Sequence, residues 1–372
     1  MSTTIFQGSR TINFNGQAPS AEQEARRCPD ELVERYQGLI DDRRLSWTEH
    51  LRLKRMLGAG GQGVVFLSER RGTDRFSLPV ALKIFSPERY TDGRSYDEAM
   101  ARIAHVASRV AQIQQDNLLD VHNFVDRNRI RLMEMEWIDG YDLEQLLTME
   151  MLQRVKDRVS NKRWEYINNV IVTAGPVHPR LKPGIAVAIA RECLAGLAAL
   201  HREEIVHGDL KPANIMLKRT GNAKIVDIGS AIDLQDPPPV RTCTPTYAAP
   251  EVLDRDECTP RSDLASLGYV LIEMLAGRPL FSGISDYSAL LEAKRALPHN
   301  IEQIFPEDVA RNRMLVNFCR GLIAPDPMLR FPSAEAADLV KEGAADFQRQ
   351  LVKGDLASEY ENEIRVWLEE LD

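Results

Sequence analysis

Four side chains between positions 209 and 227 have the chemistry that transfer of a phosphoryl group requires. The Asp209 carboxylate could accept a proton from a hydroxyl, and the Lys211 ammonium could neutralise a phosphate oxygen. Asn214 and Asp227 supply the hard oxygen atoms that Mg²⁺ prefers. A base, a cation and a metal site are what phosphoryl transfer needs from a protein, so we expect an active site here.

The sequence around these residues resembles the catalytic and metal-binding loops of eukaryotic-like protein kinases. Asn214 follows Asp209 by five residues, Asp227 follows Asp209 by eighteen, and Glu251 follows Asp227 by twenty-four. These intervals match the protein-kinase pattern. Taken singly, Asp209 could be a turn residue and Asn214 a helix cap, but the joint spacing disfavours that. The resemblance rests on three segments: VHGDLKPAN (206–214), VDIG (226–229) and APE (249–251).

The resemblance implies a part for each residue. Asp209 would be the base that orients the substrate hydroxyl, Lys211 would contact the γ-phosphate, and Thr244 would bridge the two. Asn214 and Asp227 would hold Mg²⁺. A lysine two residues after the aspartate resembles Ser/Thr-specific members more than tyrosine-specific ones.

A glycine-rich stretch is a candidate loop for the ATP phosphates. Gly58, Gly60 and Gly63, followed by Val65, satisfy the spacing G-x-G-x-x-G-x-V. Glycines let a backbone close over phosphates, because no Cβ blocks the approach. The same spacing serves dinucleotide-binding folds, but there the loop opens a helix, whereas VVFLSE here is strand-like.

The strand that follows, VALK at 80–83, resembles the kinase strand whose lysine pairs with the α- and β-phosphates. Ala81 would contact the nucleotide and Lys83 its phosphates; a solvent-facing lysine is disfavoured by its apolar neighbours. In the family a glutamate of the next helix holds this lysine. Glu98 is the candidate, although the spacing places the expected position later, at 102–106. A solvated glutamate near a helix N-terminus is the competing interpretation.

The segment MEMEWIDGYDL, at 133–143, resembles the strand and hinge that hold adenine in this family. Met135 would guard the back of the adenine pocket, the backbone of Glu136 to Ile138 would meet the adenine edge, and Asp142 would reach the ribose. An alternating Met/Glu strand alone is more often simply half-buried. ATP and Mg²⁺ are the cofactors that the resemblance implies.

Composition and charge indicate an ordinary globular protein. Of 372 residues, 44% are hydrophobic and 27% are charged, and the formal net charge of −8 argues against a general nucleic-acid binder. The sequence holds no run of about 18 apolar residues, so we expect no membrane span. Its first residues lack the apolar core of a secretory signal. Five scattered cysteines suit a reducing compartment, so we expect a cytoplasmic location.

The order of sequence patterns predicts an α+β protein with a bilobal, protein-kinase-like fold, in which a strand-rich N-lobe precedes a helical C-lobe. One helical stretch, 95–114, interrupts the strand-like first part. We divide the chain into a disordered tail (1–28), an N-terminal helical extension (29–47), the N-lobe (48–137), the C-lobe (138–342) with an insert (148–182), and a C-terminal helical extension (343–372).

The insert at 148–182 is an unusually long connection between two C-lobe helices. It is rich in Lys and Arg, has few acidic residues, and carries Trp164 and Tyr166. It could be a solvated loop. Long ordered loops are often functional, so a docking surface for an acidic partner is the other interpretation. The acidic extension at 343–372 could cap the lobe or form a dimer contact.

Two substitutions depart from the family pattern at the active site. Ile228 replaces a phenylalanine and keeps an apolar side chain. Gly208 replaces the arginine that usually receives a phosphorylated activation loop. Residues 231–241 contain no Ser, Thr or Tyr, and three prolines stiffen them. We therefore expect activity that does not require phosphorylation of this loop.

Two further residues concern the activation segment, which runs from Asp227 to Glu251: Cys243 lies within it, and Arg330 lies far beyond it in the sequence. Cys243 replaces a glycine of the family; it would sense redox state only if its thiolate were stabilised, and a small tolerated side chain is the simpler interpretation. Arg330 would pair with Glu251, as a structural contact rather than a catalytic one.

The sequence as a whole is typical of a Ser/Thr protein kinase that phosphorylates hydroxyls of protein substrates with MgATP. A pseudokinase that binds nucleotide or partners without turnover is the alternative that the poor fit of Glu98 leaves open. The triplet His-Gly-Asp also resembles small-molecule kinases, such as aminoglycoside and choline phosphotransferases. These generally lack the APE segment and the Arg330-type partner, which favours protein substrates.

Overall fold

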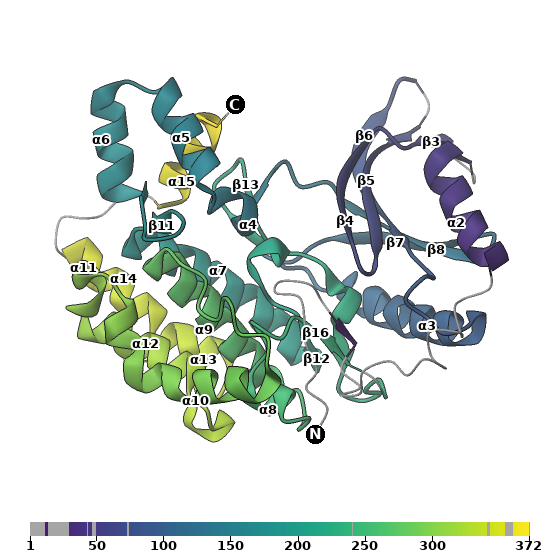
Figure 1. The fold of residues 1–372 in the computed structure, drawn as a ribbon. Coiled ribbons are helices and arrows are strands. Elements are labelled where there is room, and N and C mark those ends of the chain that lie inside the picture. Colours follow the sequence, from purple (N-terminus) through teal and green to yellow (C-terminus); the bar gives the residue numbers. More distant parts are fainter. Residues whose placement is uncertain are drawn as a thin grey trace.

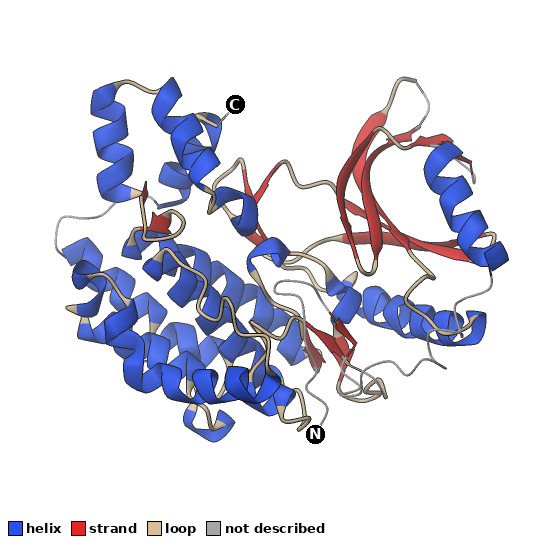
Figure 2. Cartoon of the chain, viewed as in Figure 1, coloured by secondary structure: helices blue, strands red, loops and turns tan. Residues whose placement is uncertain are grey.

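Two lobes make up the fold: a strand-rich lobe ends near Glu136, and the helical lobe follows it (Figure 1; Figure 2). The α+β class and the bilobal organisation predicted from the sequence are confirmed. The computed structural model describes residues 12–13, 30–42, 44–46, 50–72, 74–239, 241–340, 343–353 and 360–371.

A five-stranded antiparallel sheet forms the first lobe, in the order β4 (Arg55–Gly60), β5 (Gly63–Arg71), β6 (Ser77–Phe85), β8 (Ile130–Glu136) and β7 (Val121–Arg127). Val65 lies opposite Lys83, Lys83 lies opposite Met133, and Ala81 lies opposite Met135. Side chains directly opposite one another, or two apart on one strand, share a face of a sheet. The register therefore gathers these five residues on one face, although they are far apart in the sequence.

Helix α3 (Gly93–Val110) packs beside this sheet and begins with a capping box at Asp92. The sequence pattern predicted a helix at 95–114. The helix ends four residues earlier, where the N–H groups of Gln112 and Ile113 bond to the oxygens three residues back, of Arg109 and Val110, over 3.1 and 2.9 Å.

The N-terminal extension also packs on the first lobe. Helix α2 (Asp30–Asp42) has helical spacing of apolar residues, and its Leu32 and Tyr36 are buried. The hairpin of β2 (Arg44–Ser46) and β3 (His50–Arg52) follows it.

The predicted disordered tail, residues 1–28, lies outside the described residues except for β1 (Ile12–Asn13). This short strand pairs antiparallel with β16 (Thr242–Cys243), near the end of the activation segment.

Helices α7 (Pro183–Arg202) and α9 (Pro260–Ala276) form the buried centre of the second lobe. Around them lie α8 (Pro250–Leu253), α10 (Tyr287–Ile304), α11 (Glu307–Ala310), α12 (Arg313–Ile323), the turn η3 (Pro327–Leu329), α13 (Ala334–Leu339) and α14 (Ala344–Lys353). Within the described ranges, α7 is the one helix long and apolar enough to cross a membrane. Its packing against α9, α13 and α14 accounts for that apolar composition.

Short strands hold the loops where the lobes meet. β12 (Ile205–Val206) pairs with β15 (Ile232–Asp233), and β13 (Ile215–Lys218) lies between β9 (Gly140–Asp142) and β14 (Ala223–Ile225). Two tight turns, η1 (Pro212–Asn214) and η2 (Ile228–Ser230), follow β12 and β14. This arrangement brings the two loops with catalytic sequence motifs together, and the backbone of Val226 donates to Asn214 O over 2.9 Å.

The insert at 148–182 is folded, and is not a solvated loop. After α4 (Leu143–Leu146) it forms α5 (Met149–Arg158), α6 (Asn161–Val170) and a hairpin of β10 (Val172–Thr173) and β11 (Arg180–Leu181).

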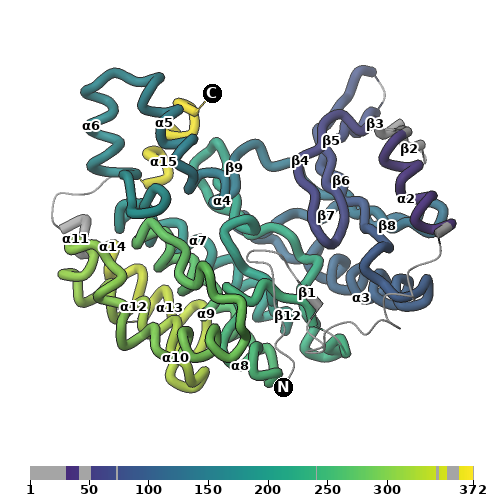
Figure 3. Tube along the Cα trace, in the orientation of Figure 1, coloured from purple at the N-terminus to yellow at the C-terminus, as the bar shows by residue number. Residues whose placement is uncertain are grey.

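The acidic C-terminal helix α15 (Tyr360–Glu369) lies beside these helices (Figure 1; Figure 3). Arg163 Nε donates to Glu370 Oε1 over 2.7 Å, and the Tyr166 hydroxyl donates to Glu363 over 2.5 Å. Trp367 is buried beneath them. The described part of this extension packs on the helical lobe of its own chain, and the dimer contact stays a prediction.

Candidate active site

A cavity of about 430 Å³ lies between the lobes, with walls from the glycine-rich loop, β6, β8, the hinge and the β13 hairpin. Most of the residues predicted to bind ATP or Mg²⁺ line it: Gly58, Val65, Ala81, Lys83, Met135, Glu136, Ile138, Asp142, Asn214 and Asp227. Gly60, Gly63 and Glu98 do not. Sequence reasoning missed the apolar residues that complete the walls, Leu57, Leu119, Met216 and Val226. Alternation along β13 could have identified Met216, two residues after Asn214.

The glycine-rich loop needs glycine at Gly63 for a steric reason. Its φ is +138°, and a Cβ there would lie 1.9 Å from the backbone oxygen of Ile84. Gly58 and Gly60 instead have no atom within 4 Å of their Cβ positions. Their open side leaves room for the backbone to approach a phosphate closely.

Lys83 is buried, and its partner is Asp227. The Lys83 side chain is 5% exposed, and Nζ lies 2.5 Å from Asp227 Oδ1 and 2.7 Å from Gln62 Oε1. Burial raises the pKa of Asp227, but the adjacent Lys83 outweighs burial and brings this pKa down to about 2. The aspartate is therefore ionised at neutral pH and compensates the buried lysine charge.

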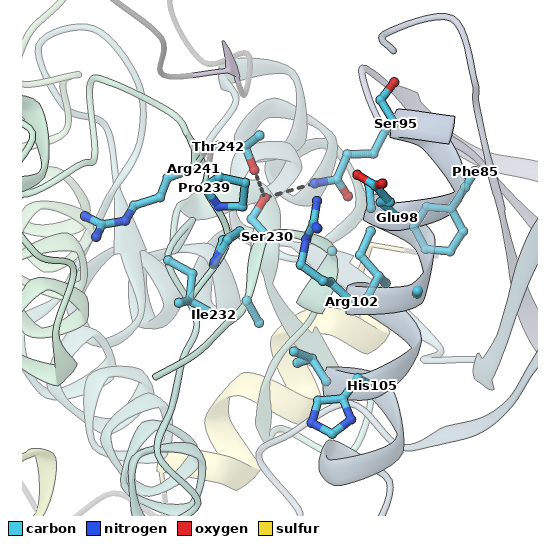
Figure 4. Close-up of a pocket in the computed structure, with 18 of the residues that line it drawn as sticks. Phe85, Ser95, Glu98, Arg102, His105, Ser230, Ile232, Pro239, Arg241 and Thr242 are labelled. Atoms are coloured by element: carbon cyan, nitrogen blue, oxygen red, sulfur yellow. Dashed lines mark hydrogen bonds between the residues drawn. The ribbon is translucent and has the colours of Figure 1, made fainter. Parts of the chain in front are cut away.

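The predicted pairing of Glu98 with Lys83 is not formed. Glu98 lies near the start of α3, 53% exposed, and its Oε1 accepts from Arg94 Nε over 2.8 Å. Figure 4 shows Glu98 and Arg102 facing Ser230 across a second cavity, of about 500 Å³, between α3 and the activation segment. Arg102 stands at the first of the positions where the family spacing predicts the glutamate, and its charge has the same sign as that of Lys83.

The acidic side chains of Glu136 and Asp142, on either side of the hinge, are bonded within the protein. The Glu136 carboxylate accepts from Lys224 and from the backbone N–H of Asp120. Asp142 caps α4, and its Oδ1 accepts from the N–H of Gln145 over 2.7 Å. Burial raises the pKa of Asp142 to about 6.

Asp209, Lys211 and Thr244, which we predicted to act together at the transferred phosphate, contact one another. Asp209 Oδ1 accepts the backbone N–H of Thr244 over 2.7 Å, and Asp209 Oδ2 lies 3.0 Å from Lys211 Nζ. Lys211 Nζ also donates to Thr244 Oγ1 over 3.0 Å. These contacts join the catalytic loop to the activation segment and hold the Asp209 carboxylate in one orientation, as a base requires.

Asn214 and Asp227 provide oxygen atoms that suit Mg²⁺. Asn214 Nδ2 donates to Asp209 O over 2.8 Å, which leaves its amide oxygen for a metal. Asp227 Oδ1 accepts from Lys83 and from Gly229 N–H, which leaves Oδ2. No group of three or more His, Cys, Asp or Glu side chains in the described residues could hold a metal. Mg²⁺ commonly uses one or two protein oxygens together with substrate phosphates, so the pair fits a site that ATP completes.

A buried aspartate of α9 holds the catalytic loop from behind. Asp263 accepts the backbone N–H groups of His207 and Gly208 over 2.8 and 2.9 Å, and lies 2.9 Å from His201 Nε2. Burial opposes its ionisation, but the hydrogen bond from His201 keeps the pKa of Asp263 below its ordinary value. Gly208 has a φ of +74°, in the left-handed region that favours glycine.

The predicted pair of Glu251 and Arg330 is present and bidentate. Arg330 Nη1 and Nη2 donate to Glu251 Oε1 and Oε2, each over 2.7 Å. The arginine side chain has no exposed surface. Ser262 Oγ also donates to Glu251 Oε1 over 2.8 Å, so the carboxylate is fully engaged.

Cys243 does not have the environment of a redox-sensing thiol. It is buried, and burial together with the negative charge of Asp209 raises the pKa of its thiol to about 12. A thiol in this state is protonated at neutral pH and reacts slowly. The simpler interpretation, a small tolerated side chain, is therefore favoured.

Comparison with known proteins agrees with this geometry. Residues 51–340 match the family model described as "Protein kinase domain". The chain is similar to serine/threonine-protein kinase PrkC of Bacillus subtilis, 26% identical over 79% of this chain and 40% of that protein. It is also similar to PknD of Mycobacterium tuberculosis (34% identical over 61% of this chain and 30% of that protein) and to PknA of Corynebacterium glutamicum (28%, 80% and 55%), both serine/threonine-protein kinases. The chain thus spans 30–55% of the length of these relatives.

Proposed function

Because this chain belongs to the protein kinase family, we propose that it transfers the γ-phosphoryl group of ATP, with Mg²⁺, to Ser or Thr hydroxyls of protein substrates. The observation that carries the proposal is the mutual contact of Asp209, Lys211 and Thr244 within 3.0 Å. Lys83 and Asp227 line the neighbouring cavity. The names of the three relatives support Ser and Thr as the acceptors.

Each charged group has a task that its position supports. Asp209 orients the hydroxyl and takes its proton as the hydroxyl oxygen bonds to the γ-phosphorus. Lys211 neutralises charge on the transferred group, and Lys83 neutralises charge on the remaining phosphates. ADP leaves with the electron pair of the broken P–O bond. Bound Mg²⁺, with Asn214 and Asp227 as protein ligands, supplies further neutralisation of the phosphate oxygens.

Transfer of radiolabelled phosphate from ATP to a generic basic protein tests the proposal. Asp209→Asn should reduce the rate about a hundredfold or more, because an amide cannot take the proton. Its affinity for ATP should stay close to that of the wild type, which shows that the variant is folded. Absence of any transfer that depends on Asp209 would contradict the proposal.

A pseudokinase is the second candidate, because no carboxylate of α3 reaches Lys83. The same assay separates the two functions: ATP binding without Asp209-dependent transfer would favour a scaffold. The buried Glu251–Arg330 pair supports protein substrates over small-molecule acceptors, since small-molecule kinases of this type generally lack it.

A further inference from the structure

The family pattern predicts that a carboxylate of the helix after β6 contacts the buried ammonium of Lys83. In this chain a neutral amide, from a different element, contacts it instead. Glu98 is exposed and bonded to Arg94. Arg102, at the first of the positions 102–106 that the family spacing gives, carries a positive charge like that of Lys83 and cannot take the place of the glutamate. To meet phosphates in one orientation, Lys83 therefore needs a residue besides Asp227 that fixes the direction of its ammonium group.

Gln62, at the tip of the glycine-rich loop, makes that contact. Its Oε1 accepts from Lys83 Nζ over 2.7 Å, and its Nε2 donates to Ser230 Oγ over 2.9 Å. Ser230 Oγ also accepts from Thr242 Oγ1 over 2.9 Å, a bond drawn in Figure 4. One side chain thus joins Lys83 to the beginning and, through Ser230, to the end of the activation segment.

The local backbone is built around this amide. A Cβ on Gly229 would lie 2.0 Å from Gln62 Oε1, so a larger residue at 229 would displace the amide. The backbone oxygen of Gln62 accepts from the N–H of Ser86 over 3.0 Å, which fixes the loop tip next to β6. The absence of a side chain at Gly229 and the bond between Gln62 O and the N–H of Ser86 therefore both favour the observed position of Gln62.

We propose that Gln62 is a positioning residue for Lys83, in place of the helix glutamate, and that it couples Lys83 to the activation segment. An ammonium group has three N–H donors. Asp227 and Gln62 each accept one, and the third stays for a phosphate in the cavity that Lys83 lines. A neutral amide orients the ammonium without adding a second negative charge beside the phosphates. The inference rests on the proposed function only in requiring that Lys83 meet ATP.

Binding of a non-hydrolysable ATP analogue and of adenosine, each measured without turnover, tests the proposal. Gln62→Ala should weaken binding of the ATP analogue about tenfold, because the charged hydrogen bond is lost. Adenosine affinity should not change, since adenosine has no phosphate for Lys83 to contact. Gln62→Glu keeps an acceptor of the same length and should recover part of the loss. Gln153→Ala, which removes an exposed glutamine of α5, is the matched control and should bind like the wild type.

Kinetics give a second readout. Gln62→Ala should lower kcat/KM for ATP by a similar factor and leave the KM for the protein substrate unchanged. Equal losses for ATP and adenosine would indicate a general structural effect and overturn the proposal. A loss for Glu98→Gln as large as that for Gln62→Ala would also overturn it.

The two proposals fail in different ways. A wild-type protein that binds the ATP analogue but transfers no phosphate would contradict the proposed function, while the binding comparison would still decide the part played by Gln62. A wild type that binds no ATP analogue would overturn both.

Discussion

At the scale of single residues, compensation of charge organises the active site. Lys83 is buried, and burying a charge without a partner of opposite sign costs roughly several kcal/mol of folding free energy. Asp227, 2.5 Å away, offsets that cost. Asp209 and Lys211 compensate one another in the same way across 3.0 Å. Each charge that phosphoryl transfer needs is thus held by an opposite charge within the site.

Asp142 should make nucleoside binding depend on pH. Burial raises the pKa of its carboxyl to about 6, so the group is ionised near neutrality and gains a proton as the pH falls through that value. The ionised form accepts stronger hydrogen bonds from ribose hydroxyls, so adenosine affinity should fall about threefold to tenfold between about pH 7.5 and pH 5. Fluorescence titration with adenosine, which has no phosphate to titrate, measures this.

The control for this prediction is Asp142→Asn, which should bind adenosine weakly at both pH values. A wild-type affinity that does not vary with pH would mean that Asp142 does not contact the ribose.

At the scale of elements, the activation segment is held in place by bonds that need no phosphate. β15 pairs with β12, and Asp233 of β15 lies 2.7 Å from Arg109 of α3. Ser230 and Thr242 share a hydrogen bond across the segment. We propose that these contacts take the place of the phosphate–arginine pair that holds the segment in kinases switched by phosphorylation.

Activity should therefore survive removal of the Thr242 hydroxyl. Thr242→Ala removes the bond to Ser230 but leaves the β12–β15 pairing, the Arg109–Asp233 pair and the bond between Gln62 and Ser230, so its transfer rate should stay within about threefold of the wild type. The assay uses protein made in bacteria, and mass spectrometry of the wild type reports whether Thr242 carries phosphate. Loss of nearly all activity would show that this segment needs modification after all.

Polar side chains of the insert bond to acidic side chains of the C-terminal segment. Arg163 and Tyr166 of the insert bond to Glu370 and Glu363, so these two side chains already have acidic partners within the same chain. Other basic residues of the insert are exposed: Arg154, Lys156, Arg158 and Lys162. A docking surface for an external acidic partner stays a prediction, and these four side chains are where it would bind.

At the scale of the whole molecule, the site lies where the lobes meet, and each lobe contributes a different part. The sheet presents Lys83 and the apolar wall of the cavity from one side. The helical lobe presents Asp209 and Asn214 on a loop anchored by the buried Asp263. The phosphates and the acceptor hydroxyl would therefore be held from opposite sides.

The Glu251–Arg330 pair should be a main support of the helical lobe. Arg330→Ala leaves the Glu251 carboxylate buried without its charge partner, so the free energy of unfolding should fall by about 3–5 kcal/mol. Urea unfolding followed by circular dichroism measures the change. Arg311→Ala is the matched control, because it removes an exposed i,i+4 partner of Glu307 and such pairs contribute little. Equal shifts for the two variants would contradict a special structural importance of the buried pair.

Prediction from the sequence succeeded best where a recognised family motif identifies the residues, even when they lie far apart along the chain. The contacts of Asp209 with Lys211 and Thr244 and the pairing of Glu251 with Arg330 all follow from recognised spacing. It was weakest where apolar residues from several strands and hairpins meet. Leu57 of β4 and Leu119, in the connection between α3 and β7, are ordinary apolar residues, and periodicity does not say that both face one cavity.

The sequence by itself determined the fold class and the set of groups able to move a phosphoryl group. The intervals between Asp209, Asn214, Asp227 and Glu251 are those of protein kinases, and they can be recognised without knowing how the rest of the chain packs. Only the tertiary structure decided what holds Lys83. That partner depends on the register of α3 against the sheet, which leaves Glu98 in solvent, and on the reach of Gln62 from the opposite loop. Neither property is encoded in local spacing.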